Sequence, residues 1–158
     1  MKVGFGFDVH RMVEGRKFYL GGIEISHSKG AEGHSDADVL IHAICDALLG
    51  AANLGDIGIH FPDTSPEYKN IDSKVLLKKV CALLKSKKYS IGNIDSTICL
   101  EKPKIFEYIP AMKKTLAVVM EIDEEKISIK ATTSEKLGFV GREEGISSYA
   151  VVLIDPEK

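Results

Sequence analysis

The sequence lacks an apolar run of the ~18 residues that a membrane-spanning helix requires. It also lacks an excess of either charge, because its formal net charge is −2 and most of its lysines and arginines are scattered. We therefore expect neither a membrane protein nor a broad nucleic-acid-binding surface. The cysteines Cys45, Cys81 and Cys99 lie far apart without a C-x-x-C pair, which indicates reduced thiols rather than a disulfide framework or a structural zinc site.

An export signal is missing as well, since no apolar core followed by a small-residue cleavage site begins the chain. A cytoplasmic location is expected, or an organelle lumen if a transit segment has been removed. With 158 residues, 44% of them hydrophobic and 28% charged, the chain has the composition of a globular protein and is too short for two typical domains. We expect a single domain, 1–158.

Hydrophobic periodicity predicts strands at residues 2–10, 91–100, 127–131 and 146–154, and helices that begin near residues 39, 73 and 111. Gly21-Gly22 between two short apolar runs predicts a small hairpin. Residues 27–33, 56–70 and 138–145 show no period and are expected to be loops. The predicted fold class is α+β, with a mixed four-stranded sheet, helices packed on one face and the added hairpin.

A metal site is indicated by the spacing of Asp8 and His10, which lie two apart in a predicted strand and so point the same way, with Val9 facing the core. His42 is the best third ligand because it interrupts an apolar stretch of helix. Two histidines and one carboxylate, with an open fourth position, are the composition of a catalytic zinc site. The alternative is that His42 is a hydrogen-bonded structural residue.

Two aspartates lie one helical turn from His42 on either side, and either Asp38 or Asp46 could orient the imidazole. The other histidines that compete for the ligand role are His27, His34 and His60.

Anion-binding groups precede the first predicted helix, where His34-Ser35-Asp36 could hold a phosphate; equally, Ser35 or Asp36 could simply cap the helix. After the third predicted strand, residues 132–135 concentrate three hydroxyls and the Glu135 carboxylate, which suits phosphate and a hard cation. A locally bonded polar turn explains the same residues.

Further residues have two readings each. Asp56-Ile57-Gly58 could bind a sugar diol or form a turn. Phe5, Phe7 and Phe139 could line an apolar cavity, although the core is the safer assignment for them.

Several motifs occur together in one order: G-F-D-V-H-R at 6–11, H-S-D-A-D at 34–38, D-A-L-L-G-A-A at 46–52, G-D-I-G at 55–58, F-P-D-T at 61–64 and K-A-T-T-S-E-K-L-G-F at 130–139. The chain thereby resembles the 2-C-methyl-D-erythritol 2,4-cyclodiphosphate synthase family over nearly its whole length. The resemblance implies a lyase of non-mevalonate isoprenoid biosynthesis that converts 4-diphosphocytidyl-2-C-methyl-D-erythritol 2-phosphate to the cyclic diphosphate and CMP. It also implies a homotrimer with active sites between subunits.

The same resemblance assigns roles to residues. Asp8, His10 and His42 hold zinc, and Glu135 contacts a Mg²⁺ or Mn²⁺ ion on the substrate phosphates. His34 and Thr133 are the catalytic residues that steady the transition state. The implied substrate-binding residues are Asp8, Val9, His10, His34, Ser35, Asp56, Ile57, Gly58, Phe61, Pro62, Asp63, Thr64, Ser65, Leu100, Glu101, Lys102, Pro103, Lys104, Ile105, Phe106, Thr132, Thr133, Ser134, Glu135, Phe139 and Arg142.

Within that set, residues 100–106 form the cytidine pocket, with Lys104 near the phosphates, and Asp56 and Gly58 hold sugar or erythritol hydroxyls beside the wall 61–65. A central cavity near Phe5, Phe7, Phe139 and Arg142 is implied as a possible site for a prenyl diphosphate. Two other functions compete with this one: a zinc-dependent phosphoester hydrolase, and a nucleotide- or isoprenoid-binding module without activity.

Overall fold

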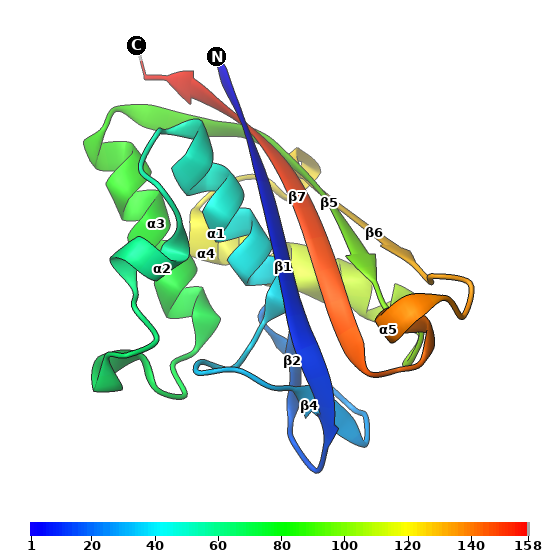
Figure 1. The fold of residues 1–158 in the computed structure, drawn as a ribbon. Coiled ribbons are helices and arrows are strands. Elements are labelled where there is room, and N and C mark those ends of the chain that lie inside the picture. Colours follow the sequence, from blue (N-terminus) through cyan, green and yellow to red (C-terminus); the bar gives the residue numbers. More distant parts are fainter. Residues whose placement is uncertain (158) are drawn as a thin grey trace.

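A five-stranded mixed sheet carries helices on one of its faces (Figure 1). The computed structural model describes residues 1–157 of the chain. The strands are, in their order across the sheet, β4 (Lys29–Ala31), β1 (Lys2–Glu14), β7 (Gly145–Pro156), β5 (Tyr89–Cys99) and β6 (Ile127–Thr132). Strands β5 and β6 run parallel, whereas the other neighbouring pairs in this sheet are antiparallel.

Three longer helices cover the sheet: α1 (Val39–Ala51), α3 (Ser73–Ser86) and α4 (Ile109–Met120). Helix α1 lies on β1 and β7, and α3 packs between α1 and α4. The shorter elements are the hairpin β2 (Phe18–Leu20) and β3 (Ile23–Ile25), the helices α2 (Ile57–His60) and α5 (Gly138–Gly141), and the 3-10 turns Pro66–Tyr68, Phe106–Tyr108 and Glu124–Lys126. No helix within residues 1–157 is long and apolar enough to cross a membrane.

The α+β class and the hairpin predicted from the sequence are confirmed, whereas the prediction of four strands in the sheet is wrong. The fifth strand, β4, falls in the segment 27–33 that was expected to be a loop. It has three residues, too few to show a period, and it pairs with β1 beyond the predicted end of that strand, where Met12 lies opposite Ala31. Short helices likewise occupy part of the expected loops 56–70 and 138–145.

Two glycines of β1 allow α1 to approach the sheet closely. A Cβ atom on Gly4 would collide with the carbonyl oxygen of Ala47, and one on Gly6 with that of Ala43. The alanines on this face of the helix add little bulk of their own, so the helix backbone rests against the strand. This close contact sets the distance between the β1 side chains beyond Gly6 and the first turns of α1.

The opposite face of the sheet is not covered by helices. Exposed apolar side chains gather on this face along two neighbouring strands, β1 and β7. They are Val3, Phe5, Phe7, Val9, Tyr149 and Val151, each at least 42% exposed in the single chain. The predictions that Val9 faces the core and that Phe5 and Phe7 belong to it are therefore wrong, because the odd-numbered side chains of β1 point away from the helices. Phe139, in α5, lies outside the core as well, because it is 42% exposed and lines a hollow at the surface. We call the six residues on β1 and β7 the open-face patch.

Candidate functional site

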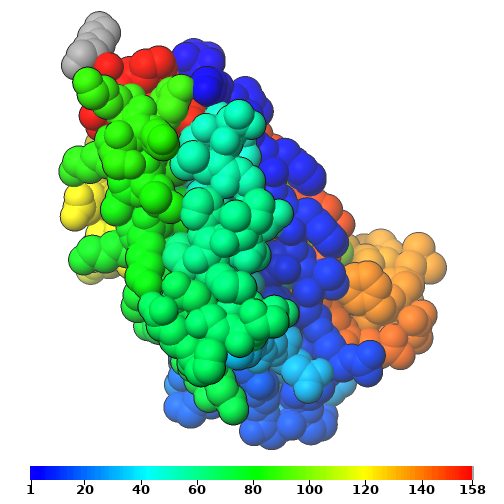
Figure 2. Space-filling model, turned by 60° about the vertical axis from the view of Figure 1, so that its left-hand side comes forward, coloured from blue at the N-terminus to red at the C-terminus, as the bar shows by residue number. Residues whose placement is uncertain are grey.

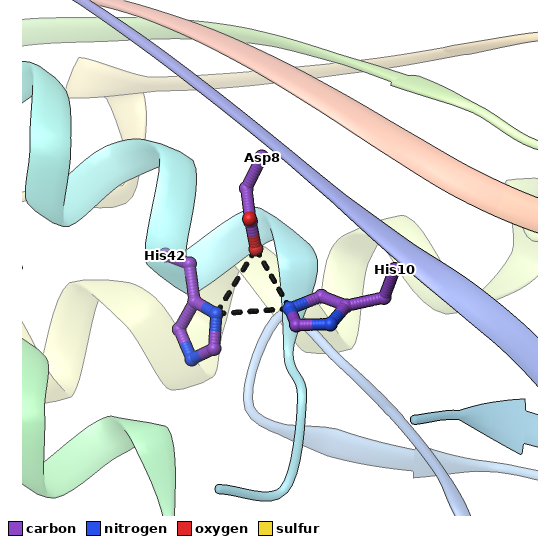
Figure 3. Close-up of side chains that lie close together, drawn as sticks. All are labelled: Asp8, His10 and His42. Atoms are coloured by element: carbon purple, nitrogen blue, oxygen red, sulfur yellow. Dashed lines mark hydrogen bonds and ion pairs between the residues drawn. The ribbon is translucent and has the colours of Figure 1, made fainter. Parts of the chain in front are cut away.

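A carboxylate and two imidazoles meet where β1 passes the first turns of α1 (Figure 3). Asp8 Oδ2 lies 2.9 Å from His10 Nε2 and 3.0 Å from His42 Nδ1. The two ring nitrogens are 3.2 Å apart. Asp8 and His10 share the helix-facing side of β1, as the strand spacing predicts, and His42 faces them from α1. We call these three residues the metal triad.

The triad has the composition and spacing of a metal site. Tetrahedral zinc with bonds of ~2.0–2.1 Å to nitrogen and oxygen places its ligand atoms about 3.3 Å from one another, close to the distances found here. The second nitrogen of each ring is also held. His10 Nδ1 donates to the carbonyl of Glu32 at 2.8 Å, which leaves the Nε2 lone pair free for a metal.

The pKa values of Asp8 and His10 are shifted by their contacts within the triad. Burial alone raises the pKa of Asp8, but its interactions with the imidazoles of His10 and His42 outweigh this effect and hold the pKa at about 2, below the ordinary 3.8. Burial lowers the pKa of His10, and its hydrogen bond and attraction to the Asp8 carboxylate reverse this, so that its pKa is raised.

The aspartates on either side of His42 in the helix have other tasks, so the prediction that one of them orients the imidazole is wrong. Asp38 is fully buried and accepts hydrogen bonds from the backbone N–H groups of Gly21, Gly22 and Ile41. It therefore caps α1 and ties the β2–β3 turn to it. Asp46 accepts from the N–H of Ile57 and holds α2 in place.

The imidazole of His42 is held from its far side by two serines. Its Nε2 lies 3.0 Å from Ser73 Oγ and 3.1 Å from Ser35 Oγ. Ser35 and Asp36 do not cap α1, because Asp38 does; Ser35 is instead buried against His42, and its hydroxyl also accepts from the N–H of Ala37. Sequence reasoning missed the role of Ser73, for which helix-start statistics were the available signal.

The predicted substrate wall lies beside His34. Its Nε2 donates to the carbonyl of Ser65 at 3.1 Å, and its own carbonyl accepts from the N–H of Asn70. The Phe61 ring packs edge-on against Tyr68 at 5.5 Å. The structure thus brings residue 34 and the segment 61–65 together. Nearby, Asp56 caps α2 by accepting from the N–H of Ile59, so residues 57 and 58 form the start of a short helix rather than the turn that was one of the two alternatives for this segment.

A second group of predicted residues gathers at the far edge of the sheet, where β5 and β6 end. The N–H of Leu100 donates to the carbonyl of Thr132 at 2.9 Å. Lys102, which precedes a cis peptide bond to Pro103, pairs with Glu143 at 2.9 Å. The segment after β6 projects from the body (Figure 2). We call residues 100–106 and 132–135 the edge loops.

Within the edge loops, the polar residues after β6 bond to one another. Thr133 Oγ1 donates to Glu135 Oε1 at 3.2 Å and accepts from the N–H of Glu135 at 3.3 Å. The locally bonded turn considered for this segment is therefore present. The side chain of Glu135 is exposed and Thr133 is partly exposed, so ligands can still reach both.

One chain does not bring the metal triad and the edge loops together. Asp8 lies opposite Ser148, Ser148 opposite Ile98, and Ile98 opposite Ala131, the residue before Thr132. Three strand spacings, roughly 14 Å, separate the two ends of this row. The triad also points to the helix-covered side of the sheet, whereas the edge loops lie beyond β6, the edge strand away from β1.

A hollow of about 500 Å³ lies beside the triad, at the end of the open sheet face. It is lined by Val9, His10, Arg11, Phe139, Glu144 and Gly145. Arg142 forms a two-pronged ion pair with Glu144 beside it, at 3.0 and 3.2 Å. Of the competing histidines, His60 donates to the carbonyl of Leu54 and His27 lies near the Phe18 ring. Among the described residues, the metal-ligand group found is Asp8, His10 and His42 alone.

The fold and the triad define an α+β protein with two histidines and one carboxylate placed so that they could hold a metal ion. Comparison with known proteins narrows this class. The chain belongs to the YgbB family, whose model matches residues 1–155.

Named relatives agree with this membership. The 2-C-methyl-D-erythritol 2,4-cyclodiphosphate synthase of Bacteroides thetaiotaomicron is 67% identical over 157 residues, which are 99% of each chain. The protein of the same name from Chlorobium phaeobacteroides is 58% identical over 158 residues, 100% of this chain and 99% of the relative.

Solved structures of related proteins share the fold of this chain. A 2C-methyl-D-erythritol-2,4-cyclodiphosphate synthase with bound CDP superposes with a TM-score of 0.90 at 36% identity, covering 98% of this chain and 100% of the other. The bifunctional IspDF of Campylobacter jejuni gives a TM-score of 0.95 at 41% identity. That match covers 98% of this chain and 42% of the bifunctional one.

Proposed function

We propose that this chain is a 2-C-methyl-D-erythritol 2,4-cyclodiphosphate synthase, a lyase of isoprenoid biosynthesis. Its substrate is 4-diphosphocytidyl-2-C-methyl-D-erythritol 2-phosphate, and its products are the cyclic diphosphate and CMP. The observation that carries this function is a metal triad with an open position on a chain 67% identical to a relative of that name. A related structure holds CDP, the nucleotide part of such a substrate.

The reaction as proposed needs no nucleophile from the protein. An oxygen of the substrate's 2-phosphate attacks the β-phosphorus, the bond from that phosphorus to the bridging oxygen breaks, and CMP leaves with the electron pair. Holding both ends of one molecule in the right geometry is the main task of the site. We assign the catalytic roles to His34 and Thr133, which steady the charge on the phosphates, with Lys104 nearby.

Two metal ions belong to the proposal. Asp8, His10 and His42 hold zinc, and the donor set and ligand spacing support that choice. The exposed carboxylate of Glu135 contacts Mg²⁺ or Mn²⁺ on the substrate phosphates. When bound, these cations supply Lewis acidity and neutralise charge on the phosphate oxygens.

The remaining substrate contacts are assigned by region. Backbone groups of residues 100–106 form the cytidine pocket, and residues 132–135 follow them along the diphosphate. Ser35, Asp56, Ile57 and Gly58 take the hydroxyls of the methylerythritol or ribose, beside the wall made by Phe61, Pro62, Asp63, Thr64 and Ser65. The contact of His34 with Ser65 supports this wall.

A homotrimer with active sites between subunits completes the proposal. The roughly 14 Å between the metal triad and the edge loops in one chain supports a site shared by two chains. The open-face patch supports contact between sheets, because a soluble chain rarely leaves so many large apolar side chains together in water. In such an assembly the hollow beside Phe139 and Arg142 would face the threefold axis, where a prenyl diphosphate is the predicted ligand.

Three further parts of this proposal are a single catalytic domain over residues 1–158, a cytoplasmic location (or an organelle lumen if a transit segment has been removed) and a prenyl diphosphate in the central cavity.

The decisive experiment incubates the purified protein with the diphosphocytidyl substrate, zinc and Mg²⁺, and follows CMP and the cyclic diphosphate by ³¹P NMR. Both products are expected, and a chelator should stop their formation. Running the reaction in ¹⁸O-water distinguishes a hydrolase, whose product would carry solvent oxygen, from the cyclase, whose product carries none. Binding of CDP with no release of CMP from substrate would overturn the proposal in favour of a binding module.

A further inference from the structure

Behind the metal triad, a line of buried polar groups runs from α3 to the imidazole of His42. Ser73 is fully buried at the first residue of α3, and its Oγ lies 3.0 Å from His42 Nε2. The same hydroxyl donates to Asp36 Oδ1, while the Ser73 N–H donates to Asp36 Oδ2 at 3.0 Å. Both oxygens of the Asp36 carboxylate are thus engaged by one residue.

The direction of the hydrogen bonds follows from the groups themselves. An ionised carboxylate only accepts, so the single hydrogen of the Ser73 hydroxyl points to Asp36. The Ser73 oxygen must then accept from His42, which places the imidazole hydrogen on Nε2. Nδ1, the nitrogen 3.0 Å from Asp8, keeps its lone pair for a metal.

We propose that Ser73, anchored by Asp36, is a positioning residue that fixes the tautomer and ring orientation of His42 for metal binding. Ser35 also touches His42 Nε2, but its own hydrogen is not committed to an acceptor in the structure, so it tolerates either tautomer. Ser73 tolerates one. This inference rests on the proposed metal at the triad and adds α3, a third element, to β1 and α1 in building the centre.

A purely structural role for Ser73 makes a different prediction. Asp72 already caps α3 through the N–H of Lys74, so the bonds of Ser73 to Asp36 could serve only to attach the helix to the segment before α1. In that case removal of the hydroxyl would lower stability and leave metal affinity unchanged. Stability and metal affinity must therefore be measured separately.

The test compares Ser73→Ala with Ser96→Ala. Ser96 is 2% exposed and donates to the Ser128 carbonyl at 2.9 Å inside the sheet, so the control also deletes one buried serine hydroxyl and its hydrogen bond. Zinc affinity is measured by competition with a chromophoric chelator, and the geometry of the centre by the visible spectrum of the cobalt-loaded protein. Loss of a partner behind a metal-bound histidine typically weakens metal binding about 10–100-fold.

We expect that loss, with a changed cobalt spectrum, for Ser73→Ala, and wild-type values for Ser96→Ala. Asp36→Asn keeps the shape but removes the charge that orients the hydroxyl, so it should shift both readouts in the same direction by less. It decides the matter if Ser73→Ala does not fold. Wild-type zinc affinity and spectrum in a folded Ser73→Ala or Asp36→Asn protein would overturn the inference. Failure of the wild-type protein to bind zinc would instead remove the metal from the proposed function.

Discussion

The metal triad and the edge loops, the two halves of the proposed site, are built in opposite ways. The triad is enclosed by β1 and α1, and the second nitrogen of each of its rings is held by a hydrogen bond. The edge loops lie at the other side of the sheet, where the segment after β6 projects from the body (Figure 2), and the polar groups of that segment bond chiefly to near neighbours in sequence. The polar groups of the triad are thus held by segments distant in sequence, whereas those after β6 are held mainly by one another.

This difference has a physical origin in how the charges are housed. A carboxylate in the buried half must be satisfied by the protein, because an unpaired buried charge costs too much. An exposed carboxylate is satisfied by water and can be offered to a ligand or cation. The buried half suits tight binding of a resident metal, and the exposed half suits contact with a substrate that comes and goes.

Removal of one triad ligand should give the largest effect. In His42→Ala the three-ligand set is incomplete, so bound zinc should be lost. Cyclisation should then slow by at least about 10³-fold, because a bound metal contributes several kcal/mol of charge stabilisation in the transition state. Elemental analysis gives the metal content and ³¹P NMR the rate. His60→Ala is the control, because His60 bonds to a backbone carbonyl outside the triad and should keep full zinc. Full zinc in His42→Ala would refute the triad.

Removal of one carboxylate near the triad and of one in the edge loops should lower the free energy of unfolding by different amounts. Asp38→Ala leaves two buried N–H groups and one partly buried N–H group without an acceptor and should lower the free energy of unfolding by about 2–4 kcal/mol. Glu135→Ala, in the exposed half, should change it by less than about 0.5 kcal/mol. Thermal unfolding of the metal-free proteins at one fixed concentration measures both. Equal losses would show that the edge loops are as organised as the metal half.

Mixed assemblies test whether the two halves belong to different chains. His42→Ala and Glu135→Ala should each be nearly inactive. When co-expressed, random association should give about a quarter of the sites an intact triad from one chain and intact edge loops from its neighbour. Recovery to that fraction of wild-type CMP release is expected. The pair His42→Ala with Asp8→Ala, both in the triad, should not recover; neither should the first pair if every site lies within one chain.

The sequence foretold the triad better than its surroundings. Asp8 and His10 are two apart in a strand, so their common side follows from local geometry. Local geometry does not say which side of the strand faces the helices, because the packing of the helices on the sheet decides that. The prediction for Val9 is wrong for this reason. The contact of Ser73 with His42 joins residues 31 apart through the packing of α3 on α1, which no local pattern encodes. Strand β4 could not be predicted from the sequence for a similar reason, because its three residues are recognised as a strand only by their pairing with β1.

The open-face patch can be tested by the mass of the assembly, which should change threefold. Val151 is 43% exposed at the middle of β7 on the uncovered side of the sheet. A lysine there would bring three charges into the proposed sheet-to-sheet contact, so Val151→Lys should move the mass measured by light scattering from three chains to one 17.3 kDa chain. The triad should still bind zinc, since both its elements are intact, but activity should be lost because the edge loops of a neighbour are gone. Val118→Lys, at a valine 73% exposed on α4, carries the same charge on a helical surface away from the patch and should leave mass and activity unchanged. A Val151→Lys protein that remains an active trimer would show that the patch is not the contact that brings the two halves together.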